Sequence, residues 1–280
     1  MELTVLSWNL FHGRDFPPDP GLRTWRSRLL RLETRNATHV QVNRDLTAEF
    51  ATVLSRAEWD VAMLQECPPR FAEPLAQACG AEAHRTLTSR NQLGALRGLL
   101  ARQNPDLMAS GEGGSNLILV RVPGKLGGIA ERREMAIHEG EPERRAMGFV
   151  RTASGVCVAN LHATNDWPKL AAEDVAKAAR AALEWSAGSP LVFGGDLNLR
   201  PGKNPRIFQR LRDEFGLASP TTAPNAIDHI LCRGLDVLDP PAQWPPEARE
   251  LPLEGRALRL SDHAPVQARF LAEDPHLLRN

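Results

Sequence analysis

The chain of 280 residues has no tyrosine, a formal net charge of zero, and 34 basic residues of which only four are lysine. A protein that holds nucleic acid by bulk electrostatic attraction is usually basic, so the balanced charge argues against that class and leaves open only a locally positive groove. No apolar run approaches the roughly 20 residues that a membrane-spanning helix needs. We therefore expect a globular protein without a membrane span.

Cysteine is also sparse. The four cysteines show no metal-binding spacing, and Cys157 and Cys232 lie inside apolar, strand-like runs, where a thiol behaves as a small hydrophobic group. The N-terminal segment 1–5 enters a strand directly, without the basic and apolar regions of a signal peptide. These features predict a reduced, cytoplasmic protein, which we expect to be a monomer.

Two short polar motifs stand at the edges of apolar runs. Gly-Asp-Leu-Asn at 195–198 follows the apolar run 191–193, and Ser-Asp-His-Ala at 261–264 precedes another apolar run. An ionised aspartate in a dry interior costs several kcal/mol unless it is paired or bound to a metal ion. Asp, Asn and His held together at strand ends are the groups that divalent-metal hydrolysis of a phosphate ester requires.

Six strand-like runs along the chain end in groups that can bind a hard metal ion or transfer a proton. One such ending is weak evidence, because Asp and Asn close many strands as turn residues. Six in one chain are hard to explain by turn chemistry alone. The endings are Asn9, Glu66, His162, the pair Asp196 and Asn198, Asp228, and the pair Asp262 and His263.

This order of motifs resembles the endonuclease/exonuclease/phosphatase superfamily. The matching motifs are Trp-Asn, Gln-Glu, Asn-x-His, Gly-Asp-x-Asn, Ile-Asp-His and Ser-Asp-His-x-Pro, and they run from Asn9 to Val266. The resemblance implies an α/β fold, a four-layer α/β/β/α sandwich of two mixed sheets flanked by helices, with the site at one end of the sheets. We expect one catalytic domain over residues 1–272 and a C-terminal tail over 273–280.

The resemblance also implies a metal site. Glu66 is the first candidate for a direct ligand, with Asn9 beside it and Asp262 as a second carboxylate. Mg²⁺ takes oxygen ligands and usually binds through one or two carboxylates. The expected cofactor is therefore Mg²⁺ or Mn²⁺. His12, three residues after Asn9, is a candidate for the rim of the site.

The catalytic groups are expected at the remaining strand ends. By resemblance, Asp196 aligns or activates the attacking water, with Asn198 in support. A carboxylate that accepts from one ring nitrogen of a histidine raises the basicity of the other, and we assign Asp228 to His263 on this ground. Whether Asp196 or His263 is the general base stays open.

Three further residues are expected at the substrate. His162 occupies the position from which relatives address a non-bridging phosphate oxygen. Asn160, two residues earlier on the same side of the strand, is expected to support substrate binding. Arg145 is the candidate phosphate-facing arginine, and Arg144 is an equal alternative.

Segments outside the motifs carry helix signals. Residues 46–57 and 168–186 have apolar side chains at helical spacing, and Asn204-Pro205 predicts the start of another helix. Within 86–115, leucines recur at helical spacing, and a flexible loop is expected over 111–115. The proline-rich stretch 240–246 predicts an extended loop.

The leading interpretation is a divalent-metal-dependent hydrolase of phosphoester bonds, either a phosphodiesterase or a nuclease, with nucleic acid among the candidate substrates. The alternatives are a phosphomonoesterase or lipid- or inositol-phosphate phosphatase on the same scaffold, and a non-catalytic binding module. A nuclease predicts a basic groove that spans several phosphates. A small-molecule phosphatase predicts a pocket with arginine or lysine gathered at one end.

Overall fold

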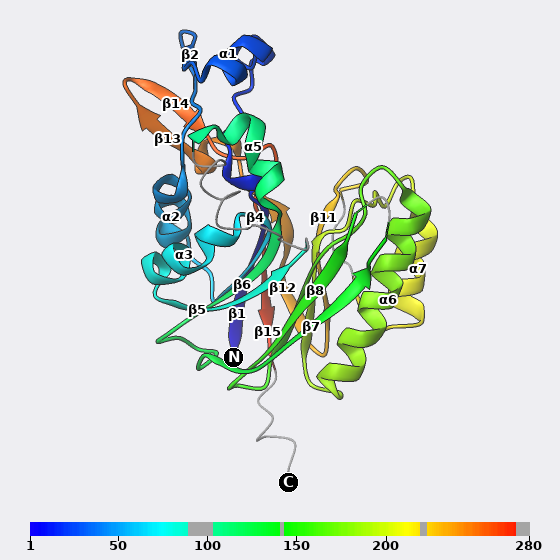
Figure 1. Ribbon diagram of the computed structural model, residues 1–280. Helices are drawn as coiled ribbons and strands as arrows, with labels where there is room; N and C mark the ends of the chain where they lie inside the picture. Colours follow the sequence, from blue (N-terminus) through cyan, green and yellow to red (C-terminus); the bar gives the residue numbers. More distant parts are fainter. Residues whose placement is uncertain (89–102, 141–142, 219–222, 273–280) are drawn as a thin grey trace.

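Two packed β-sheets form the centre of the molecule (Figure 1). The computed structural model describes residues 1–88, 103–140, 143–218 and 223–272. The strand order of the first sheet is β12 (Asp236–Gln243), β15 (Val266–Leu271), β1 (Glu2–Asn9), β4 (Val61–Cys67), β6 (Ser115–Arg121) and β5 (Ala81–Leu87). That of the second is β11 (Asp228–Arg233), β10 (Leu191–Asp196), β9 (Cys157–His162), β8 (Arg145–Thr152) and β7 (Ile129–His138).

Helices cover the outer faces of both sheets. Helices α2 (Thr47–Arg56) and α3 (Ala72–Cys79) pack against the six-stranded sheet, and α6 (Pro168–Ser186) and α7 (Pro205–Asp213) pack against the five-stranded sheet. A third apolar core, which includes Val5, Met63, Val158 and Val192, fills the space between the sheets. The four-layer α/β/β/α sandwich of two mixed sheets is confirmed.

Each sheet contains one parallel pair of strands near its middle, and these pairs position the site. Strand β1 runs parallel to β4, which brings Asn9 and the end of β4 to one edge of the first sheet. Strand β9 runs parallel to β10, and the register sets His162 opposite Asp196. Because parallel strands end at the same edge, the polar strand ends predicted from the sequence gather at one end of the sandwich.

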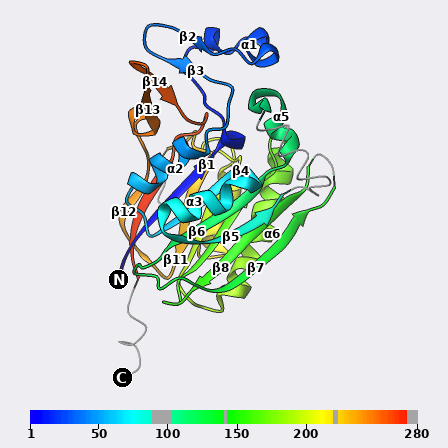
Figure 2. The ribbon, with the colours of Figure 1, turned by 60° about the vertical axis from the view of Figure 1, so that its left-hand side comes forward.

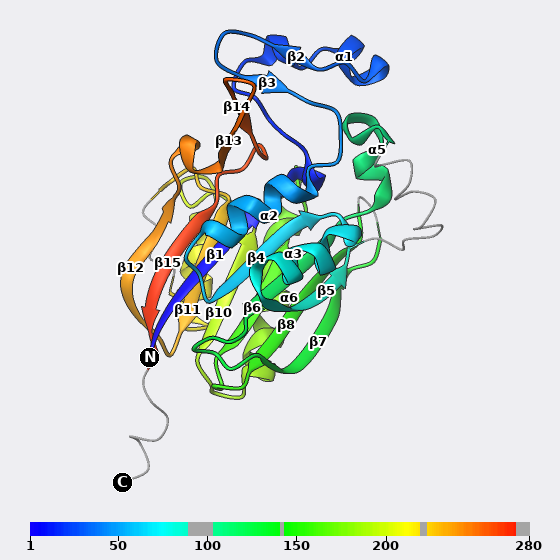
Figure 3. The ribbon, with the colours of Figure 1, turned by 90° about the vertical axis from the view of Figure 1, so that its left-hand side faces the viewer.

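A group of short elements stands beyond that end (Figures 2 and 3). It consists of the 3₁₀ turns η1 (Phe11–Gly13) and η2 (Pro20–Leu22), helices α1 (Trp25–Leu30) and α5 (Pro105–Glu112), and the small pairs β2 (Thr34–Arg35) with β3 (Val40–Gln41) and β13 (Glu250–Leu253) with β14 (Arg256–Arg259). The N-terminus lies at the opposite end of the molecule. No helix in the described ranges is long and apolar enough to cross a membrane.

Most local predictions agree with the structure. The helix expected over 168–186 has those bounds, and the one expected over 46–57 is α2, which begins at Thr47, where the Asp45 side chain accepts the backbone N–H of Thr47 at 2.9 Å. The helix signalled by Asn204-Pro205 is α7. The leucines at helical spacing within 89–102, and the tail 273–280, lie outside the described residues.

Two local predictions are wrong. Helix α5 extends through Gly111 and Glu112, where a loop was expected; it opens at Pro105, and the N–H groups of Leu107 and Met108 donate to the Asn104 carbonyl oxygen. The proline-rich stretch belongs in part to strand β12. That strand lies at the sheet edge and pairs with β15 in an irregular register, so Pro240 and Pro241 need not donate to a second neighbour.

A buried carboxyl group near the end of η1 makes stability depend on pH. Asp15 is buried, and its Oδ2 accepts the backbone N–H of Val42 at 3.1 Å. Burial raises the pKa of Asp15 from 3.8 to about 8, the nearby carboxylate of Asp106 adds to this, and the charge of Arg23 opposes it. Between these pH values the folded chain holds a proton that the unfolded chain has lost, so the free energy of unfolding falls as pH rises, by at most about 1.4 kcal/mol per pH unit.

We expect Asp15→Asn to remove this pH dependence, because asparagine accepts the same N–H without a charge. Urea denaturation at pH 5 and pH 8 would measure it. The variant should gain stability relative to the wild type at pH 8 and gain much less at pH 5. An equal difference at both pH values would contradict the assignment.

Candidate active site

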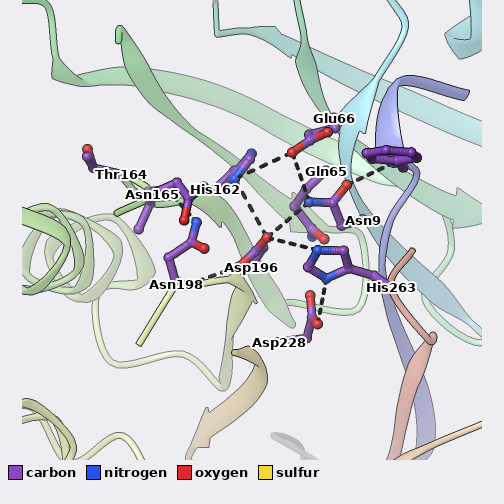
Figure 4. A network of polar contacts seen from close by, with 12 residues as sticks. Asn9, Gln65, Glu66, His162, Thr164, Asn165, Asp196, Asn198, Asp228 and His263 are labelled. Atoms are coloured by element: carbon purple, nitrogen blue, oxygen red, sulfur yellow. Dashed lines mark hydrogen bonds and ion pairs between the residues drawn. The ribbon is translucent and has the colours of Figure 1, made fainter. Parts of the chain in front are cut away.

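A cavity of about 840 Å³ opens where the two sheets end. Figure 4 shows the polar side chains that meet there from both sheets. The structure brings seven of the predicted residues to its wall: Glu66, Arg145, His162, Asp196, Asn198, Asp262 and His263.

His263 and Asp228 form an ion pair beside the cavity. His263 Nδ1 lies 2.9 Å from Asp228 Oδ2, and the loop that carries His263 is fixed by hydrogen bonds from Trp8 and Arg249 to the His263 carbonyl oxygen. Burial alone would lower the pKa of His263, but the charge and hydrogen bond of Asp228 raise it to about 10. His263 is therefore an imidazolium near neutral pH. Its Nδ1 is taken up by Asp228, and its Nε2 is on the side of the ring toward the cavity.

Asp196 lies at the centre of the cluster (Figure 4). Its Oδ2 accepts from Asn9 Nδ2 at 3.0 Å and lies 3.6 Å from His162 Nε2 and 3.8 Å from His263 Nε2. Burial raises the pKa of Asp196 to about 7, and the negative charge of Asp228 adds to this. A carboxylate with a pKa near neutrality is suited to accept a proton during catalysis.

Glu66 points into the cavity because the end of β4 is distorted. The register with β6 is irregular between Leu64 and Cys67, and Glu66 has a φ of +45°. Its carboxylate accepts from Asn9 Nδ2 at 3.2 Å and lies 3.1 Å from His12 Nε2. Burial would raise the pKa of Glu66, but His12, His162 and Asn9 together lower it to about 2, so this side chain is ionised.

His162 is neutral near neutral pH. Burial lowers its pKa to about 3, and the charge of Arg145 contributes to the shift. Its Nε2 lies 3.9 Å from Glu66 Oε1. A neutral imidazole between two carboxylates can donate one hydrogen bond without a net charge.

Backbone strain is concentrated around the cavity. Nine residues other than glycine have positive φ in the described ranges, and five of them surround the site, with φ between +45° and +57°. Such conformations cost about 1–3 kcal/mol each and persist where the surroundings enforce them. The strained residues at the site are Phe11, His12, Glu66, Asn198 and Ser261.

Asn160 does not line the cavity, which corrects its expected role in binding substrate. Its Nδ2 donates to the carbonyl oxygens of Leu64 and Leu117, at 3.0 and 3.1 Å, and its Oδ1 accepts from Gln65 Nε2 at 2.8 Å. The residue is fully buried. It therefore joins the two sheets beneath the site.

Asn9 is oriented differently from a metal ligand. Its Oδ1 accepts the backbone N–H of Phe11 at 2.9 Å, while its Nδ2 donates to Glu66 and Asp196. In this arrangement the amide fixes the two carboxylates side by side. Asn198 is a similar support, since its Nδ2 donates to the Ala163 carbonyl oxygen at 3.0 Å.

His12 is closer to the reacting groups than the sequence suggested. It was a candidate for the rim, yet its Nε2 contacts Glu66 directly, and burial lowers its pKa. The signal that pointed to it was its position three residues after Asn9, at the end of β1. The turn η1, with positive φ at Phe11 and His12, returns the imidazole over the strand ends.

Charged residues of the segment between β7 and β8 form another wall. Arg145 is buried, and its Nη2 contacts Glu143 at 2.8 Å, while its Nε has no hydrogen-bond partner among the described residues. Glu139 and Arg144 also line the cavity. The exposed carboxylate of Glu143 therefore holds the guanidinium that was expected to bind phosphate.

We expect Glu143→Gln to lower the KM for an anionic substrate several-fold with little change in kcat. The variant removes the charge that competes for Arg145, and a charge-assisted pair of this kind is worth about 1.5–3 kcal/mol before solvent screening. Steady-state kinetics would measure the split, with Glu184→Gln on α6 as a control away from the cavity. A raised KM would show that Glu143 orients Arg145 and does not compete with substrate.

The donor groups of the cavity fit a divalent cation. Glu66 is ionised, and burial together with the charge of Glu66 raises the pKa of Asp262 despite nearby His263, so a cation held by both carboxylates would offset their repulsion. Ligand atoms of a second group, Asp196, Asp228 and His263, lie within 4.8 Å of one another. In that group His263 and Asp228 already bond to each other, so the oxygen donors Glu66 and Asp262 suit a hard cation better.

Comparison with solved structures shows the same fold. An endonuclease/exonuclease/phosphatase family protein from Bacteroides thetaiotaomicron matches with a TM-score of 0.65 and 15% identity, over 98% of this chain and 96% of that one. A mannosyl-6-phosphatase from the same species matches with a TM-score of 0.63 and 16% identity, over 96% and 99%. Truncated TDP2 from Caenorhabditis elegans matches with a TM-score of 0.59 and 17% identity, over 97% and 98%.

No curated protein matches the chain in sequence. The family model for the endonuclease/exonuclease/phosphatase family matches residues 6–263, which include every strand end at the cavity. Members of this family are metal-dependent phosphoesterases. With the two-sheet fold and the carboxylate and imidazole cluster at its end, this match shows that the chain belongs to the endonuclease/exonuclease/phosphatase family.

Proposed function

We propose that the protein is a divalent-metal-dependent phosphodiesterase of small substrates, which cleaves by in-line attack of water on phosphorus. The observation that carries the proposal is the convergence of Asp196, His162 and His263 in one cavity, with Nε2 atoms 3.6 and 3.8 Å from Asp196 Oδ2. The convergence provides a proton acceptor and two imidazole donors for one reacting group. No nucleophilic serine or cysteine is required.

Each residue of the cluster has a separate role in the proposed reaction. Asp196 is the proton acceptor for the attacking water, held in place by the Asn9 amide and by the backbone N–H of Asn198. His263, kept protonated by Asp228, and neutral His162 donate hydrogen bonds to the phosphoryl oxygens as negative charge develops on them. Mg²⁺ or Mn²⁺ bound by Glu66 and Asp262 would neutralise charge on the phosphate and stabilise the leaving oxygen.

The charge of the cavity favours a phosphodiester over a phosphomonoester. Among the described lining residues, five carboxylates face three cationic groups, which are two arginines and the His263 imidazolium. A diester carries one negative charge and a monoester carries nearly two at neutral pH, so the monoester is repelled more strongly. The carboxylates are Glu66, Glu139, Glu143, Asp196 and Asp262, and the arginines are Arg144 and Arg145.

The same balance disfavours nucleic acid. A polynucleotide needs a basic track over several successive phosphates, and the described lining offers only the adjacent pair Arg144 and Arg145. That pair at one side of the cavity is the observation that favours the second candidate, a phosphomonoesterase. One of the structural relatives is named a mannosyl-6-phosphatase, and monoesters are therefore tested as substrates as well.

A substrate panel tests the proposal. Purified protein would be assayed with Mg²⁺ or Mn²⁺ on bis(p-nitrophenyl) phosphate, p-nitrophenyl phosphate, a sugar phosphate and single-stranded DNA. We expect kcat/KM to be highest on the small diester and every activity to disappear on chelation. A higher kcat/KM on the monoesters would replace the diester assignment with the phosphomonoesterase, and efficient cleavage of DNA alone would replace it with a nuclease.

A further inference from the structure

Exposed apolar side chains are concentrated on two neighbouring helices at the end of the molecule that carries the cavity. Of eleven large apolar side chains exposed in the described ranges, six belong to α1, the residue two positions after it, and α5. Trp25 is 71% exposed, and Leu29 and Leu30 are each 55% exposed. The full set, called the α1–α5 patch below, is Trp25, Leu29, Leu30, Leu32, Leu107 and Met108.

The α1–α5 patch is held in a fixed arrangement by the amides of buried Asn43 and half-buried Asn104. Asn43 Nδ2 and Asn104 Nδ2 both donate to the Arg28 carbonyl oxygen, at 3.2 and 2.9 Å, and Asn43 also donates to Asn104 Oδ1 at 2.8 Å. These bonds join the C-terminal part of α1 to the start of α5. The Thr24 side chain caps α1 by accepting the Ser27 N–H at 3.0 Å. The apolar side chains thus stand outward from a bonded base.

Positive charge lies along the α1 side of the α1–α5 patch, whereas α5 carries Asp106 in its first turn. The stretch 25–32 contains three arginines and no acidic residue. Arg26 and Arg31 are exposed and form no ion pair with any described residue, whereas Arg35 is paired with Glu254 at 3.1 Å. An exposed surface of tryptophan and leucine among arginines has the composition of segments that lie in the interface of an anionic membrane.

We propose that the α1–α5 patch docks the protein on the surface of an anionic phospholipid bilayer, with the cavity end turned toward that surface. Tryptophan and leucine enter the boundary between headgroups and acyl chains, and Arg26 and Arg31 contact lipid phosphates. Helices α1 and α5 and the ends of β1 and β4 lie at the same end of the molecule (Figures 1 and 3). A phosphoester presented at a bilayer would therefore meet the side of the protein on which the cavity opens.

The composition of the patch distinguishes this partner from two others. Single-stranded nucleic acid binds through aromatic stacking and arginine, but the four leucines of the patch would gain nothing from it. A second copy of the chain would bring its own arginines against Arg26 and Arg31, and these like charges would be desolvated without a partner. A lipid surface satisfies both the apolar and the cationic groups.

Vesicle co-sedimentation tests the proposal. The full chain would be mixed with vesicles of phosphatidylcholine alone or with added phosphatidylglycerol, at low and high salt. We expect binding to the anionic vesicles that weakens with salt, and about tenfold or greater loss of binding in the double variant Trp25→Ser, Leu29→Ser, from the apolar area removed. Trp167→Ser is the matched control, since Trp167 is 61% exposed and precedes α6.

The hydrolysis of a soluble phosphodiester should be unchanged in the double variant. Vesicle binding and hydrolysis therefore test the docking proposal and the proposed function separately. If that variant does not fold, Leu107→Ser on α5 replaces it. The proposal is overturned if the wild type does not sediment with anionic vesicles or if the variants bind as well as the wild type. It is equally overturned if the variants lose DNA binding, or lose dimerisation in sedimentation velocity, and keep vesicle binding.

Discussion

Asp196→Asn is expected to lower kcat on phosphoesters by about 10²- to 10⁴-fold, the range over which a positioned general base contributes. Asparagine keeps the shape of the side chain and its contact with Asn9, but it cannot accept a proton from water. Asp196 lies on the cavity wall, where its contacts with Asn9, His162 and His263 fix its position. The KM should change much less than kcat, since Asp196 acts on water and not on the bound ester.

Rapid kinetics under saturating metal and substrate would measure the loss, and circular dichroism would confirm that the variant is folded. Asp213→Asn is the matched control, because Asp213 lies on the exposed face of α7 and pairs only with Arg212 among the described residues. A variant that retains wild-type kcat would transfer the proton-accepting role to another group, and His263 would be the next candidate.

Asp228→Asn is expected to reduce kcat even further, by about 10⁴-fold, the loss seen when a carboxylate that orients a catalytic imidazole becomes an amide. In the wild type, His263 Nδ1 lies 2.9 Å from Asp228 Oδ2, and the negative charge of Asp228 holds the pKa of His263 at about 10. An amide leaves the imidazole free to lose its proton and to adopt the other tautomer. The hydrogen bond from His263 Nε2 to the phosphoryl oxygen is then lost in the transition state.

A second readout separates this role from a structural one. Titration of the His263 ring by NMR should show a pKa that falls by several units in Asp228→Asn, together with a shift of the pH profile of kcat. Asp236→Asn, on the exposed edge strand β12, should change neither. If the pKa of His263 falls as expected in Asp228→Asn but kcat is unchanged, the His263–Asp228 pair has no part in the mechanism.

The functional strand ends could be located from the sequence because charged side chains stand directly beside apolar runs. Glu66, Asp196 and Asp228 each follow or open an apolar run, and only a shared site makes such charges tolerable. The alternation of side chains also set Asn160 and His162 on one face of β9, and both do face the other sheet. The alternation of side chains does not predict how far along the strand each residue lies from the cavity. Two residues along a strand span about 6.6 Å, enough to move Asn160 from the cavity to the space between the sheets.

Other features depend on tertiary context that the sequence does not state. The contact between His12 and Glu66 involves positive φ angles at Phe11, His12 and Glu66, and none of these three residues is a glycine that would predict such a conformation. Trp25 and Leu29 of α1 have the i, i+4 spacing of a buried helix face, yet both are exposed. Sequence patterns predict which residues prefer to be buried, and the fold alone decides which of them find a partner.

A calorimetric titration of Mn²⁺ and Mg²⁺ into the wild type and Glu66→Gln would show whether Glu66 holds the metal ion on which hydrolysis depends. We expect saturable binding to the wild type and a loss of about tenfold or more in affinity in the variant, because a half-buried ionised carboxylate facing the cavity becomes a neutral amide. Glu139→Gln, on the same cavity wall, should bind metal nearly as the wild type does. Unchanged metal affinity in Glu66→Gln, or hydrolysis by the wild type that persists in the presence of a chelator, would contradict the account.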